Sequence, residues 1–134
     1  MSLTVAPDLL RQAERGTVDE ESFVGCVRES LPYAYELVER LVGELSSGGS
    51  GHVEDYVANT VPPPDERARG QLLRLVASDA MRGAMERRFG VRLAFQNCHR
   101  LAVFDKAAAD GTAYREFVSP RAQLLNQSPE MVNC

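Results

Sequence analysis

The sequence predicts an α+β fold that is mostly α, with an N-terminal helical bundle, a small antiparallel sheet and a short helical tail. Two observations support this order. Apolar residues recur with a helical period up to Gly90, and with the alternating period of a strand directly after it. The composition is that of a globular chain, with 44% hydrophobic and 25% charged residues among 134. This length suits one core, so we expect a single domain over residues 1–134.

Three helices are expected before residue 46, and each has a recognisable start. Pro7 and Gly16 bracket the first, since proline fits the first turn of a helix and glycine fits its end. Thr17 and Glu20 form a capping box that opens the second helix. Pro32 opens the third, whose apolar residues recur along one side of the helix: Ala34, Leu37, Val38, Leu41, Val42 and Leu45.

The next segment links these helices to the rest of the chain. Residues 46–51 read Ser-Ser-Gly-Gly-Ser-Gly, the composition of a flexible connector, and we expect a mobile loop within the domain. The apolar residues Val53, Tyr56, Val57 and Val61 then suggest a short helix that ends before three consecutive prolines.

An arginine-rich helix over residues 65–89 is expected to be the longest element and the one around which the others pack. Asp65 provides a capping oxygen at its start, and Gly90 can adopt the left-handed conformation that closes its last turn. Small residues on this helix would let a second backbone approach closely. We therefore expect a homodimer interface there, formed by Ala77, Ala80, Gly83 and Ala84.

The sheet is expected after Gly90. Apolar residues alternate over residues 91–96 and again over residues 101–104, which predicts two strands joined by a turn at residues 97–99. The sheet is therefore expected to be an antiparallel β hairpin or, if residues 112–118 after an Asp-Gly turn pair add a strand, a three-stranded sheet. The tail contains two Ser-Pro pairs, each suited to start a short helical turn, at residues 119–120 and 128–129.

Composition indicates a cytoplasmic protein from a GC-rich bacterial genome. Fourteen arginines stand against one lysine, Lys106, a ratio typical of such genomes, those of actinobacteria included. The first residues lack a leader, and no apolar run approaches the ~18 residues of a membrane span. Three cysteines are an odd number, and a reducing cytosol argues against a disulfide framework.

Charge is distributed unevenly along the chain. Residues 1–45 carry nine acids and four arginines, a balance of −5, whereas residues 65–100 carry eight arginines and four acids, a balance of +4. Ion pairing between the two segments is the simplest account. The pI of about 5.2 argues against a polyanionic ligand. The arginines of the long helix also do not converge on one side of it, so we rank nucleic acid low among the partners.

Candidate ligand-binding residues cluster near the turn that follows the first strand. Cys98 and His99 are adjacent, but neighbouring side chains on a strand point to opposite faces, so they cannot easily act on each other as nucleophile and base. The amides of Gln96, Asn97 and Asn126 would line a pocket with His99 if the tail folds back on the sheet. Ordinary turn chemistry with solvated amides is the alternative, and the one that we favour.

No motif indicates a metal ion or a cofactor. The cysteines and histidines lack the paired spacing of zinc ligands, and the glycines of residues 48–51 match no phosphate-binding fingerprint. We assign no catalytic residue, no metal and no cofactor.

The sequence leaves three hypotheses for the function. The first is a non-enzymatic interaction or regulatory module that self-associates as a homodimer, with another protein as a further partner. The second is a small-molecule-binding protein or an enzyme, with a pocket between the sheet and the C-terminal tail that uses Cys98 or His99. The third is nucleic-acid binding through the arginine-rich helix.

Overall fold

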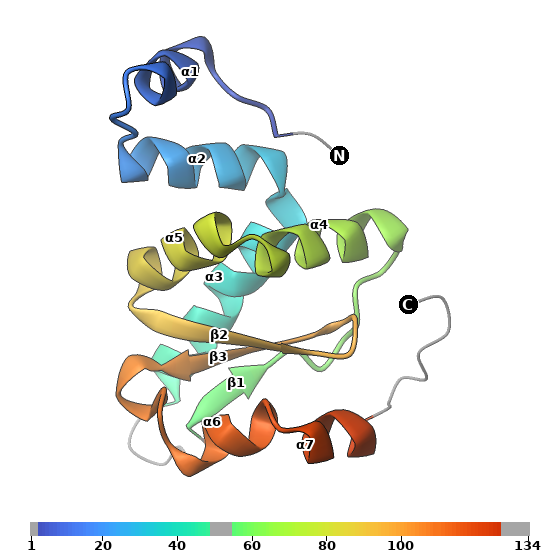
Figure 1. Cartoon of the computed structure of the whole chain (residues 1–134). Helices are drawn as coiled ribbons and strands as arrows, with labels where there is room; N and C mark the ends of the chain where they lie inside the picture. Colours follow the sequence, from blue (N-terminus) through green and yellow to red (C-terminus); the bar gives the residue numbers. More distant parts are fainter. Residues whose placement is uncertain (1–2, 49–54, 127–134) are drawn as a thin grey trace.

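The computed structural model describes residues 3–48 and 55–126, and it confirms the α+β, mostly helical class. The elements that these residues form follow one another along the chain (Figure 1): α1 (Pro7–Glu14), α2 (Glu20–Ser30), α3 (Pro32–Ser47), β1 (Tyr56–Ala58), α4 (Glu66–Ala77), α5 (Asp79–Phe89), β2 (Val91–Gln96), β3 (Arg100–Asp105), the 3-10 turn η2 (Lys106–Ala108), α6 (Thr112–Phe117) and α7 (Pro120–Leu125). None of the helices in these two ranges has the length and apolar character needed to cross a membrane.

The sheet lies between two layers of helices. Its strands are antiparallel in the order β1-β3-β2, with Val57 of β1 and Leu93 of β2 both opposite Val103 of β3. α3, α4 and α5 cover one face, α6 and α7 lie on the other, and α2 packs beyond α5 with α1 outermost (Figure 1). β1 and β2 are therefore the two edges of the sheet.

The N-terminal helices begin largely where the sequence predicts. α1 starts at Pro7 and is followed by Gly16 with a φ of 78°, and α3 starts at Pro32. The predicted cap of α2 is wrong. Asp19, and not Thr17, is the N-cap, because its carboxylate accepts a backbone N–H of the first turn at 3.1 Å.

The apolar stripe of α3 forms the centre of the core, as predicted. Its first four members are buried, and the last two pack against the same cluster from its margin: Ala34, Leu37, Val38, Leu41, Val42 and Leu45. The helix continues through Ser47, so the first two residues of the expected connector belong to α3. Gly48 is the C-cap of this helix, and residues 49–51 of that connector lie outside the described residues.

The single helix expected over residues 65–89 is wrong, because the structure has two helices there. Asp65 caps α4 and Gly90 closes α5 in the left-handed region at φ 65°, as predicted. Between them Ser78 is extended, with φ −92° and ψ 113°, and its Oγ accepts the Met81 N–H at 3.2 Å. Ser78 thus ends one helix and caps the next. The apolar period runs through this break, which is why the pattern predicts one element.

Two further expectations are wrong. Residues 56–58 form strand β1 and not a short helix, because they pair with β3. Residues 112–117 form α6 and not a third strand, since their apolar side chains pack onto the sheet from outside it. The three-stranded sheet is present, but its third strand precedes the helices α4 and α5. The first Ser-Pro pair starts α7 as predicted, and the second lies outside the described residues.

An aromatic cluster fixes α6 against the face of the sheet that is opposite α3. Phe104 of β3 stacks on Tyr56 of β1, with ring centroids 4.6 Å apart. Tyr114 and Phe117 of α6 meet Phe104 edge-on at 5.2 and 5.7 Å. Such contacts add to the gain from burial. They also set where α6 lies, and so place Tyr114 beside the edge strand β2.

Candidate functional site

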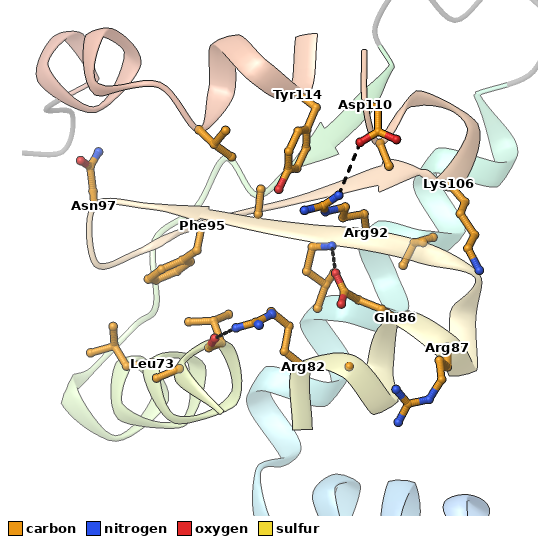
Figure 2. A pocket seen from close by; sticks show the side chains of 18 residues that line it. Leu73, Arg82, Glu86, Arg87, Arg92, Phe95, Asn97, Lys106, Asp110 and Tyr114 are labelled. Atoms are coloured by element: carbon orange, nitrogen blue, oxygen red, sulfur yellow. Dashed lines mark hydrogen bonds and ion pairs between the residues drawn. The ribbon is translucent and has the colours of Figure 1, made fainter. Parts of the chain in front are cut away.

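An open groove of about 1020 Å³ lies along the exposed edge of β2 (Figure 2). The end of α4 and the inner side of α5 form one wall. α6 and the turn that precedes it form the other wall, and β2 runs between them. Because β3 is the one partner of β2 among the described strands, the second edge of β2 faces this groove.

Apolar and aromatic side chains line the walls and the floor of the groove. Leu73 and Val76 come from α4 and Phe95 from β2, and Leu73 is 39% exposed. Tyr114 lines the opposite wall. A surface of this kind offers flat faces on which planar rings can stack.

The backbone of β2 also faces the groove. The Leu93 N–H donates to Glu86 Oε2 at 2.9 Å, so this N–H points away from β3. In an antiparallel ladder the N–H and C=O of one residue lie on the same side. Leu93 and Phe95, two residues apart, therefore both direct their backbone polar groups outward. The groove therefore contains two kinds of polar group, the backbone of this strand edge and the carboxylate of Glu86 (Figure 2).

Two cations are available at the rim beside β2. The Arg92 guanidinium lies over the ring of Tyr114, 4.5 Å from its centroid, and its contact with Asp110 is long at 3.8 Å. Lys106 of η2 is exposed, and no hydrogen bond or ion pair joins its ammonium group to another of the described residues. Guanidinium and ammonium groups both bind phosphate groups, and the planar guanidinium can also stack on a base.

Two other arginines of the groove already have partners. Arg82 donates to the Val76 carbonyl at 2.7 Å and to Asp79 at 2.6 Å, so it supports the joint between α4 and α5. Arg87 pairs with Glu20 of α2 at 2.5 Å, with both side chains half exposed. The second pair confirms the expected ion pairing between the acidic and basic segments, although an exposed pair contributes only about 0–1 kcal/mol.

Most of the sequence-based candidates at the turn between β2 and β3 are buried. Gln96 is 2% exposed and its Nε2 donates to the Phe117 carbonyl at 2.7 Å, while His99 is 8% exposed. Cys98 is buried and disulfide-bonded. The expectation of no disulfides rested on the redox state of the cytosol and not on geometry, and for this residue it is wrong. Asn97 is the one candidate among these that lines the groove.

The amides at the turn hold α7 in place. The Asn97 N–H donates to Gln123 Oε1 at 3.2 Å, the Asn97 side chain donates to the Asn126 carbonyl, and Gln123 Nε2 donates back to Asn97 Oδ1. Asn126 thus takes part through its backbone. α7 does fold back on the sheet, as one of the sequence alternatives requires, and Asn97, Gln123 and Asn126 meet there.

The small residues proposed for a dimer interface are dispersed. Ala84 is fully buried in the core, which removes it from any contact surface. Ala77 and Ala80 are exposed, and Gly83 is half-buried in the wall of the groove.

Sequence reasoning missed most of the groove. Glu86, Arg92 and Tyr114 come from three elements, and they meet only because β2 is an edge strand beside α6. The one local signal was the charge of Arg92 between the apolar residues Val91 and Leu93 of the strand. The order of the strands, which decides what lies beside that charge, is not written in any short stretch of sequence.

Fold and site together define a small α+β protein with a cationic, aromatic groove at the edge of its sheet. The chain belongs to the family described as NucS shadow ORF, whose model matches residues 1–134. The short name of this family also carries the letters KH. A comparison with curated proteins and another with solved structures returned no match.

Proposed function

We propose that this chain is a non-enzymatic interaction module whose partner is a single-stranded nucleic acid, bound in the groove along β2. The observation that supports this most is the presence of two available cations, from β2 and η2, on one groove that also holds aromatic side chains: Arg92 and Lys106. Proteins that bind single strands combine a positive groove for phosphates with flat side chains for bases.

The local charge of the groove matters more for this ligand than the charge of the whole chain. Four of the residues that line it are cationic and two are acidic, Glu86 and Asp110. Nine of the 19 acids lie within residues 1–45, mostly on α1, α2 and α3. The cations of the groove come from several elements, so binding does not require the arginines to share one side of a helix.

The letters KH in the family's short name also support binding of a single strand. KH modules bind single strands and clamp the backbone with a Gly-x-x-Gly loop. The lining of this groove holds one glycine, Gly83, and the joint between α4 and α5 reads Ala77-Ser78-Asp79. We therefore assign the phosphate contacts to the side chains of Arg92 and Lys106.

Fluorescence anisotropy with labelled ten-nucleotide single strands, RNA and DNA, tests the proposal over a series of salt concentrations. The double variant R92Q/K106Q should bind more weakly, and the slope of log K against log salt should fall by about 1.4, since each phosphate contact contributes about 0.7 for single strands. The matched control is R11Q/R15Q, which removes the same charge from α1. If the control loses as much affinity, or if the wild-type chain binds no strand, the proposal is wrong.

Self-association stays a prediction from the sequence. Ala77 and Ala80 remain exposed, and Ala77 lies one helical turn from the exposed side chain of Leu73, which supports a contact between two copies on the α4–α5 side. Because Leu73 and Ala77 also line the groove, a dimer formed there would compete with the nucleic acid. Sedimentation of the free chain and of its complex measures this directly.

A further inference from the structure

Glu86 places a carboxylate in the middle of a groove whose rim is cationic. Its Oε2 accepts the Leu93 N–H at 2.9 Å, which fixes the position of the carboxylate against β2. Figure 2 shows the side chain reaching from α5 toward the strand edge, between Arg82 and Arg92. An acidic group at this place weakens the attraction for phosphate, so its role must lie in something other than binding the backbone of the ligand.

The carboxylate keeps hydrogen-bonding capacity that the fold does not use. Leu93 is its one hydrogen-bond partner among residues 3–48 and 55–126, and no ion pair of 4.0 Å or less joins it to an arginine there. An ionised carboxylate accepts several hydrogen bonds through its two oxygens. Oε1 therefore has no hydrogen-bond partner among the described residues, and Glu86 lines the groove at the edge of β2.

Among the groups that a single strand presents, the base edges rich in N–H donors match this acceptor. Cytosine offers its N4 amino group to Glu or Asp side chains, and adenine and guanine also carry an exocyclic amine. Uracil and thymine place their single imino N–H between two carbonyl oxygens, which a carboxylate repels. Arg92 lies across the strand edge from Glu86 (Figure 2).

We propose that Glu86 selects bases that carry an exocyclic amino group, cytosine above all, over uracil and thymine. This inference rests on the proposed function, since it assigns base selection within the same groove. Glu86 acts on the base, whereas Arg92 and Lys106 act mainly on the backbone, so the two contributions separate in an experiment.

Binding of labelled ten-nucleotide oligocytidine and oligouridine to the wild-type chain provides the first test. A hydrogen bond to a charged group predicts a preference for oligocytidine of roughly tenfold or more. In E86Q the amide oxygen can still accept the Leu93 N–H, which leaves the NH₂ group facing the groove. That donor suits the carbonyls of uracil, so the preference should disappear or reverse. The control E39Q removes a carboxylate from the exposed side of α3 and should leave the preference unchanged.

A second measurement needs no variant. Oligomers of N4,N4-dimethylcytidine lack the amino hydrogens, and the wild-type chain should bind them about as weakly as oligouridine. Equal binding of oligocytidine and oligouridine by the wild-type chain, or a preference that survives in E86Q and with the methylated base, would overturn the role of Glu86 and leave the proposed function intact. Failure of every oligomer to bind would overturn the proposed function itself.

Discussion

Asn59 is the residue whose replacement gives the sharpest test of the fold around the groove. It is 9% exposed and directly follows β1. Its Oδ1 accepts the Leu101 N–H at 2.8 Å, and its Nδ2 donates to the carbonyls of His99 and Val61 at 2.9 and 3.0 Å. One side chain therefore joins the end of β1 to the turn between β2 and β3.

The variant N59A should lower the free energy of unfolding by about 2–4 kcal/mol. It removes the acceptor of a backbone N–H in Leu101, a residue that is fully buried, and a lost partner at a buried group costs about 1–3 kcal/mol. The lost donor and the small cavity add to this. For a chain of this length the change corresponds to a fall in Tm of about 10 °C.

Urea denaturation followed by circular dichroism measures the loss, and hydrogen exchange of the Leu101 amide locates it. The control T60A changes the exposed neighbour and should shift stability by less than about 0.5 kcal/mol. A loss below about 1 kcal/mol in N59A, or unchanged protection of the Leu101 amide, would refute this account of the joint.

Two further predictions concern α4 and α3. Leu72 is fully buried, so L72A should lower the free energy of unfolding, measured by urea denaturation, by about 2–5 kcal/mol. The control L73A, on the exposed side of the same helix, should lower it by less than about 0.5 kcal/mol. Similar losses in the two variants would contradict the placement of the helix. Burial raises the pKa of the Tyr33 hydroxyl above 10.0, and nearby Asp65 raises it further against the opposing effect of Arg40. The folded chain therefore holds this proton more tightly than the unfolded chain, and the resulting stability is present below pH 10 and is lost as the pH rises through the folded pKa. The urea midpoint of the wild-type chain should fall more between pH 9.5 and 11 than that of Y33F, and parallel curves would contradict this.

The sequence was most informative where structure depends on near neighbours. The prolines that open α1 and α3, and Gly90 at the end of α5, act through their own backbone geometry, so they could be read directly. The alternation of β2 and β3 was also readable, because two paired strands of six residues leave a clear period.

The errors came from contacts between distant residues. Residues 56–58 are a strand only because β3 lies beside them, and a three-residue element carries almost no period of its own. Ser78 breaks the helical segment although the apolar pattern continues across it. The groove depends on strand order and on the packing of α6, so its residues could not be grouped from their positions in the chain.

An open strand edge is also a place where two chains can join into a larger sheet. β2 reads Val-Arg-Leu-Ala-Phe-Gln, and the side chains of Arg92 and Glu86 flank its exposed edge. Charged groups in this position hinder such pairing between chains. The two side chains that we assign to the ligand therefore also protect the protein from aggregation, and replacing both with apolar residues would leave an apolar edge able to seed β-rich aggregates.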